Sequence, residues 1–86
     1  MSELFAYTDY NGDISEWDTS NVTNMKKMFN NNFVFNQPIV NWDVSNVKNM
    51  NAMFYNAIFF NQPIGDWNVS NVIDMSSMFE EAYSFN

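Results

Sequence analysis

A strict 25-residue period constrains the fold of this chain more than any other feature. Trp17, Trp42 and Trp67 lie 25 residues apart, and the sequence divides at that spacing into adjoining blocks. Ten of the 25 columns hold the same residue in all three blocks, namely in the first block Asn11, Ile14, Trp17, Ser20, Asn21, Val22, Met25, Met28, Phe29 and Phe35. A period between about 20 and 50 residues is typical of architectures in which one short unit is stacked repeatedly.

We predict one continuous domain made of these units. Its parts are repeats at 11–35, 36–60 and 61–86, preceded by residues 1–10. Leu4 and Phe5 precede the first repeat much as Met53 and Phe54 precede the third. Residues 1–10 are therefore interpreted as the trailing half of an upstream repeat.

Each repeat contains two segments with different apolar spacing. In the middle repeat, residues 39–44 end with the alternation and the β-branched and aromatic content of a short strand. Residues 47–57 carry apolar side chains three and four positions apart, as on one face of a helix. Pro38 and Pro63 disfavour helix before them and mark the turn into the next repeat. We therefore predict an α/β repeat solenoid with one short strand and one short helix or 3₁₀ segment per repeat.

The repeated columns have a structural explanation that we prefer to a functional one. We expect the Trp, Met and Phe columns to line up in the core, although exposed Trp rings would suit carbohydrate stacking. We expect the Asn and Ser columns to form hydrogen-bonded ladders. The sequence Asn21-Val22-Thr23 matches a glycosylation sequon, but the middle repeat breaks that match. Residues 9–13 resemble part of a calcium loop, with the glycine at the wrong place.

Composition excludes several functions. The chain has no Cys and no His, which removes thiolate and imidazole chemistry, and we expect no cofactor and no metal. It has three Lys or Arg against ten Asp or Glu, a net charge of −7, so nucleic-acid binding is not expected. No apolar run is long enough to insert in a membrane, and the first residues do not resemble a signal peptide.

The repeat motif resembles that of a known family. The segment Trp-Asp-x-Ser-Asn-Val-x-x-Met-x-x-Met-Phe occurs at 17–29 and 42–54, and the third repeat differs only in Asn68. This spacing is similar to that of the BspA-like leucine-rich repeats, especially the 25-residue form of Mycoplasma surface lipoproteins. The resemblance implies a right-handed, leucine-rich-repeat-like coil and an extracellular or cell-surface role in adhesion or partner binding. It brings no catalytic residues.

In such a coil, the residues between the apolar positions of the strand point outward on the concave face of the sheet. Two rows of mainly acidic residues result, and we predict them as the candidate binding face: Glu16, Asn41 and Asp66 in one row, Asp18, Asp43 and Asn68 in the other. A solvated ladder with no ligand is the simpler interpretation. The functional one is a strip for a cationic or polyhydroxyl ligand or a divalent ion.

Three functions remain open from the sequence. The first is a non-enzymatic module for adhesion or protein–protein recognition, whose ligand is a protein or a glycan. The second is a structural segment that associates head to tail with copies of itself. The third, which we rank last, is a glycosidase acting through paired carboxylates. The acidic residues recur with the repeat and form no unique cluster, so we expect no enzyme.

Overall fold

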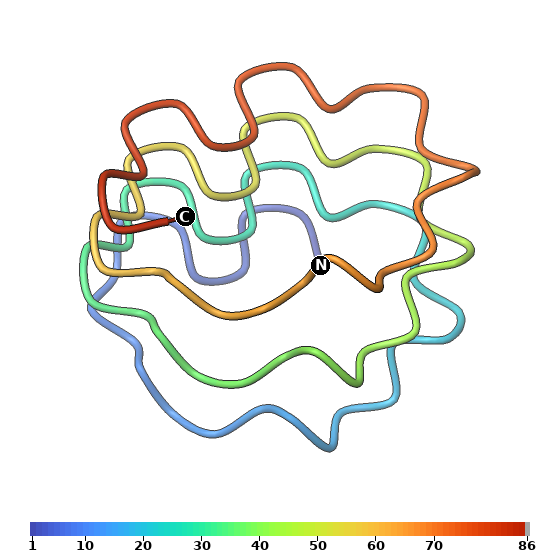
Figure 1. Ribbon diagram of the computed structural model, residues 1–86, viewed down its shortest axis with the longest axis horizontal. Coiled ribbons are helices and arrows are strands. Elements are labelled where there is room, and N and C mark those ends of the chain that lie inside the picture. The colour runs from blue at the N-terminus through green and yellow to red at the C-terminus, as the bar shows by residue number, and fades with distance from the viewer. Residues whose placement is uncertain (86) are drawn as a thin grey trace.

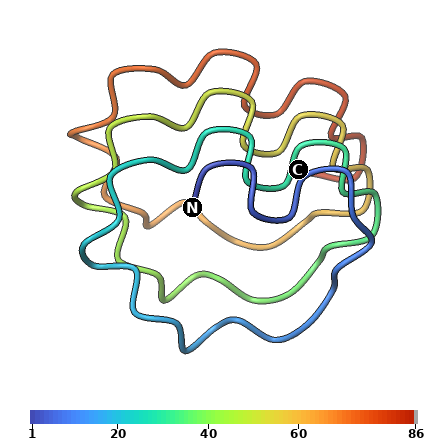
Figure 2. The same cartoon turned by 180° about the vertical axis from the view of Figure 1, so that it is seen from behind.

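The three repeats lie one above another in the computed structural model, which describes residues 1–85 (Figure 1). We call 11–35 layer 1, 36–60 layer 2 and 61–85 layer 3. Residues 1–10, the leading segment, lie beside the second half of layer 1, as the view from behind also shows (Figure 2). Within residues 1–85 there is no helix and no strand, and the β-bridges are isolated pairs, Asn24 with Asn49 and Asn49 with Asp74.

Backbone hydrogen bonds join the second half of layer 1 to layer 2 and the second half of layer 2 to layer 3. Every other N–H from Met25 to Asn31 donates to a carbonyl 24 residues later, with N···O distances of 2.8 to 2.9 Å. The same pattern runs from Met50 to Asn56. The leading segment donates to layer 1 in the same way, since the Phe5 N–H lies 2.9 Å from the Met28 carbonyl oxygen.

Two consecutive β-turns replace the expected helix in each layer. In layer 1, the Met28 N–H donates to the Met25 carbonyl at 3.2 Å and the Asn32 N–H to the Phe29 carbonyl at 3.0 Å. The third residue of each turn, Lys27 and Asn31, has φ of 56° and 58°. A positive φ at this place is what a type II turn requires. Later layers repeat it at Ala52, Asn56, Ser77 and Glu81.

The predicted α/β solenoid, a leucine-rich-repeat-like coil with a strand and a helix in each repeat, is therefore wrong. Two turns spaced by four residues place Met25, Met28 and Phe29 on one side of the backbone, as a helix would. The apolar spacing therefore does not distinguish a helix from two consecutive turns. The expected strand also bends, because the Trp42 N–H closes a turn on the Ile39 carbonyl at 3.1 Å. The result is a compact body of 26 × 26 × 23 Å.

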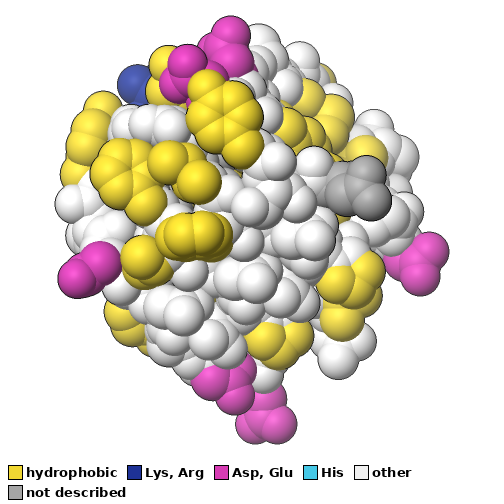
Figure 3. Space-filling model, turned by 60° about the vertical axis from the view of Figure 1, so that its left-hand side comes forward, with side chains coloured by type: hydrophobic (Ala, Val, Ile, Leu, Met, Phe, Trp, Pro, Cys, Tyr) yellow, Lys and Arg dark blue, Asp and Glu magenta, His cyan; other side chains and the backbone are white. Residues whose placement is uncertain are grey.

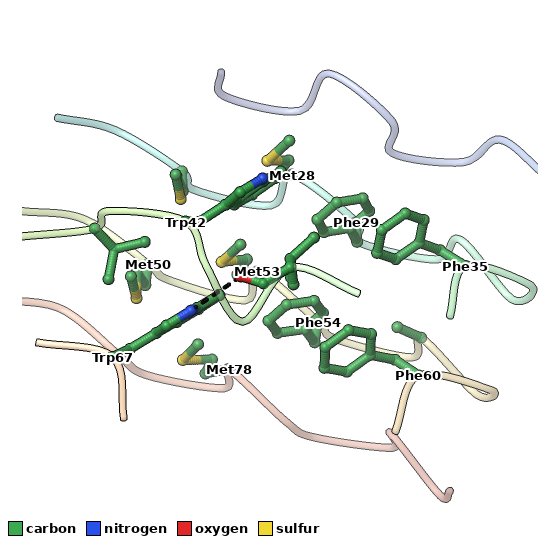
Figure 4. Close-up of a cluster of buried hydrophobic side chains, with 14 of the residues drawn as sticks. Met28, Phe29, Phe35, Trp42, Met50, Met53, Phe54, Phe60, Trp67 and Met78 are labelled. Atoms are coloured by element: carbon green, nitrogen blue, oxygen red, sulfur yellow. Dashed lines mark hydrogen bonds between the residues drawn. The ribbon is translucent and has the colours of Figure 1, made fainter. Parts of the chain in front are cut away.

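Aromatic rings stacked from layer to layer fill the centre (Figure 4). Phe29 and Phe54 are fully buried, with ring centroids 5.5 Å apart and planes within 5° of parallel. Within layer 2, Phe54 also stacks on Phe60 at 4.1 Å. Offset aromatic stacking adds about 0.5–1.5 kcal/mol per pair to the burial itself. The core is therefore a continuous stack that no single layer could form.

The tryptophan column connects the layers by a side-chain bond. Trp42 Nε1 donates to the Ile14 carbonyl at 3.0 Å, and Trp67 Nε1 donates to the Ile39 carbonyl at 3.2 Å. Both indoles are buried, which confirms the expectation of a core position for them. Trp17, in contrast, is 41% exposed.

Candidate recognition surface

The six residues of the predicted binding face are all exposed, and they lie in the first halves of the three layers. Because residues 1–85 contain no strand, the concave sheet face expected from the family resemblance is absent. The prediction that Glu16, Asp18, Asn41, Asp43, Asp66 and Asn68 bind a ligand stays a prediction.

The second row of this face closes turns. Asp43 Oδ1 accepts the Ser45 N–H at 2.9 Å and the Ser45 hydroxyl at 2.6 Å, and Asp18 accepts the same two bonds from Ser20. These bonds lower the pKa of both carboxyl groups below its ordinary value. Asn68 accepts the N–H two residues later at 3.1 Å. A neutral amide serves in the third layer, so the turn needs an oxygen acceptor and not a charge.

The structure shows no metal site on the part of the chain it describes. No group of three acidic, His or Cys side chains within residues 1–85 is placed to hold an ion. In the segment that resembles part of a calcium loop, Asp13 instead accepts the Ser15 N–H at 2.9 Å. A Cβ on Gly12 would overlap the Tyr10 hydroxyl, so this glycine makes room for the ring.

Large aromatic side chains are exposed on a different side of the molecule. Tyr7 and Tyr83 are 75% and 74% exposed, and Phe33 and Phe59 are 48% and 58% exposed. We call these four residues and the half-buried Tyr55 the aromatic surface. Figure 3 shows hydrophobic side chains gathered on the side where the layers turn at the left of Figure 1.

The same interlayer bonding that builds the core brings this surface together. The Phe59 N–H donates to the Phe33 carbonyl at 3.3 Å, and the Ser84 N–H donates to the Ile58 carbonyl at 3.1 Å, which places Phe33, Ile58 and Tyr83 in successive layers. Glutamates border the surface. The charge of Glu81 is the largest cause that raises the pKa of Tyr55, with smaller effects from burial and from Glu80.

A shallow hollow of about 320 Å³ lies beside the aromatic surface, with Tyr7 and Tyr55 in its lining. The rest of its lining includes residues in the left-handed region, Lys27, Asn31, Ala52 and Ser77, and Tyr7 itself also has a positive φ. The turns that replace the helix thus point their third residues toward this side. Strained backbone of this kind costs about 1–3 kcal/mol per residue and is found disproportionately at functional sites.

The sequence pattern did not single out this surface. Phe33 and Phe59 belong to columns that differ between repeats, whereas the predicted core comes from the invariant columns. A large aromatic residue in a variable column is the sequence signal for this surface, because a repeated core role does not explain it.

The comparisons with known proteins bear on family and not on activity. The profile of one family, described as "Mycoplasma protein of unknown function, DUF285", matches residues 1–86. The chain belongs to this family. No curated protein and no solved structure shows a significant match to the DUF285 chain. No helix within residues 1–85 is long and apolar enough to span a membrane.

Proposed function

We propose that this DUF285 chain is a non-enzymatic recognition module that binds a protein partner through its aromatic surface. The observation that carries the proposal is the exposure of Tyr7, Phe33, Phe59 and Tyr83 on one side of the molecule. Burying one such side chain is worth about 1.5–3 kcal/mol. A cluster left in water is therefore costly to keep unless a partner covers it.

The chemistry of the surface suits protein recognition. Tyr offers a large rigid ring and a hydroxyl, and it loses little conformational entropy when it is fixed at an interface. Two stacked layers hold the backbone of Phe33 and Phe59 together by a hydrogen bond, so the surface is preorganised. The proposal involves no catalysis, because Asp18 and Asp43 recur in equivalent turns and form no asymmetric pocket.

We further propose that the module acts at the cell surface or outside the cell, in adhesion or partner binding. The support is the resemblance of the repeat motif to the BspA-like repeats of Mycoplasma surface lipoproteins, together with membership of a Mycoplasma family.

Head-to-tail self-association is the second candidate, favoured by the apolar residues on the outer face of layer 3, where Met75 is 42% exposed.

The test compares two triple variants with the wild-type chain. One is Phe33→Ser/Phe59→Ser/Tyr83→Ser on the aromatic surface, and the other is Asp18→Asn/Asp43→Asn/Asp66→Asn on the predicted acidic face. Each chain is immobilised, and its binding to intact mammalian cells and to a panel of purified extracellular-matrix proteins is measured. Circular dichroism and thermal melting verify that each variant folds.

We expect the aromatic variant to lose at least tenfold in affinity, which corresponds to about 1.4 kcal/mol. The acidic variant should bind as the wild-type chain does. If the aromatic variant keeps full affinity, the surface is not the binding site. If only the acidic variant loses affinity, the face predicted from the sequence is the correct one.

A further inference from the structure

The hollow beside the aromatic surface lies along the side of the stack and crosses all of its layers. The leading segment and the three layers each contribute to its lining, for example through Tyr7, Lys27, Tyr55 and Ser77. Its volume of about 320 Å³ is at the lower end of the range of about 300–1,000 Å³ that small-molecule sites occupy. The hollow therefore has the size of a site for a small ligand.

A chain of three asparagine amides orients one donor at this hollow. Asn56 Nδ2 donates to Asn31 Oδ1 at 2.7 Å, and Asn31 Nδ2 donates to Asn30 Oδ1. Because Oδ1 of Asn30 is occupied, Nδ2 is the polar atom that this amide has left to offer. Asn30 is 5% exposed, and within residues 1–85 its Nδ2 has no hydrogen-bond partner.

This buried nitrogen opens onto the hollow. No fully enclosed side-chain nitrogen or oxygen within residues 1–85 lacks a partner, so Asn30 Nδ2 has access to the space that its residue lines. Buried polar side chains are nearly always hydrogen-bonded in folded proteins. A donor held in this position indicates a place where the acceptor atom of a ligand binds.

The other polar groups of the lining can hold hydroxyl groups. Asn51 keeps Oδ1 as an acceptor, because its Nδ2 donates to Ser76. Lys27 forms no ion pair within residues 1–85, and its ammonium group can donate three bonds. The charge of Glu81 raises the pKa of Tyr55, so the phenol stays protonated at neutral pH and can both donate and accept.

The charges around the hollow favour a neutral ligand over an anion. Glu81 and Glu80 both lie near enough to Tyr55 to affect it, whereas Lys27 is the cation of the lining. Tyr7 and Tyr55 also bring flat ring faces, on which apolar C–H groups can pack. A neutral pyranose sugar matches both features, because its hydroxyl groups donate and accept while the faces of its ring carry C–H groups.

We propose that this hollow is a binding site for a neutral pyranose sugar of a glycan. One sugar oxygen accepts from Asn30 Nδ2, a second accepts from the Lys27 ammonium group, and the ring of Tyr7 packs on the C–H face. The hollow shares Tyr7 and Tyr55 with the aromatic surface. It does not depend on the proposed binding of a protein, whose test changes three residues outside the hollow.

The test titrates the ¹⁵N-labelled chain with methyl β-galactopyranoside, with the methyl β-glycoside of N-acetylglucosamine and, as an anionic sugar, with N-acetylneuraminic acid. Tyr7→Ala removes an exposed ring from the hollow, and Tyr83→Ala removes an equally exposed ring outside it. Lys27→Ala removes the ammonium group at a position whose counterpart in layer 2 is Ala52. Lys26→Ala removes the same charge outside the lining and is its control.

We expect at least one neutral glycoside to cause saturable shifts at the backbone amides of Lys27, Asn31 and Tyr55, with half-saturation between about 1 and 20 mM. The side-chain amide signal of Asn30 should move, because its Nδ2 gains an acceptor, whereas that of Asn56 already has one and should not. Tyr7→Ala and Lys27→Ala should each weaken binding by about fivefold or more, and the two controls by less than about twofold.

The proposal is overturned if neither neutral glycoside shifts these amides at about 100 mM. It is also overturned if only N-acetylneuraminic acid binds, or if Tyr7→Ala or Lys27→Ala binds as well as its control. The triple variant of the aromatic surface should bind the glycoside as the wild-type chain does. Loss of protein binding and loss of sugar binding are therefore separate results.

Discussion

Ser77 provides a direct test of the turns that replace the helix. Its φ is 58°, and it is the third residue of the turn closed by the Met78 N–H on the Met75 carbonyl at 3.2 Å. Its side chain is exposed, so substitutions there change backbone preference and little packing. We consider Ser77→Gly and Ser77→Ala.

The structure predicts that glycine stabilises this position. A residue with a Cβ pays about 1–2 kcal/mol in the left-handed region, and glycine does not. Glycine also raises the conformational entropy of the unfolded chain, which lowers the free energy of unfolding by about 0.4–1 kcal/mol. The net gain for Ser77→Gly is therefore about 0.5–1 kcal/mol, or a rise of about 3–6 °C in the melting temperature of a domain this size. Ser77→Ala keeps the Cβ and should change little.

The assay is urea unfolding followed by circular dichroism, with the midpoints of the three chains compared at a common slope. A helix at Met75–Ala82 would give the opposite order. Alanine would be the most stable and glycine the least, by about 1 kcal/mol between them. A stability order of alanine above serine above glycine would therefore refute the turn, and with it the account of why the helix prediction failed.

Three further outcomes follow from the packing and the turns. Trp42→Phe removes one of the two donors to the Ile14 carbonyl, which keeps the Trp17 N–H, and leaves a smaller ring in a buried position. It should lower the free energy of unfolding by about 2 kcal/mol, whereas Trp17→Phe should cost less than about 1 kcal/mol, both by urea unfolding. Phe54→Ala removes a ring at the centre of the stack, and calorimetry should show a loss of about 3–5 kcal/mol; a loss below 1 kcal/mol would contradict the stack. Hydrogen bonds lower the pKa of Asp43, so its contribution to stability is present above the ordinary value of 3.8 and is lost as the pH falls through the lower native value. Asp43→Asn should thus weaken the dependence of the urea midpoint on pH between pH 5 and 2, and an unchanged dependence would count against the assignment.

The sequence predicts the stacking residues well because their burial depends only on the period. Phe29, Phe54, Trp42 and Trp67 are core residues in any arrangement that superposes the repeats. The sequence does not predict the secondary structure correctly, because Met50, Met53 and Phe54 lie on one side both in a helix and in two consecutive turns. Asn31 and Asn56 are usual residues for left-handed turn positions, but Lys27, Ala52 and Ser77 occupy the other turn without such a marker.

The candidate site was only partly accessible to sequence reasoning. The exposure of Asp18 and Asp43 follows from their polar character. Their hydrogen bonds to Ser20 and Ser45 depend on a bend in the backbone, which the predicted strand excludes. The clustering of Phe33, Phe59 and Tyr83 depends on where the chain turns between layers. Such a position is set by the packing of all the layers together and not by any local spacing.

The most direct test of the layered architecture is the measurement of scalar couplings across its hydrogen bonds by NMR. The N–H of Phe29 bonds to the carbonyl of Met53, and the N–H of Phe54 bonds to that of Met78. The structure predicts a coupling between nitrogen and carbonyl carbon for both pairs, each 24 residues apart. A coupling from Phe29 to Met25 in its place, four residues earlier, would mean that the helix forms after all and would contradict the account.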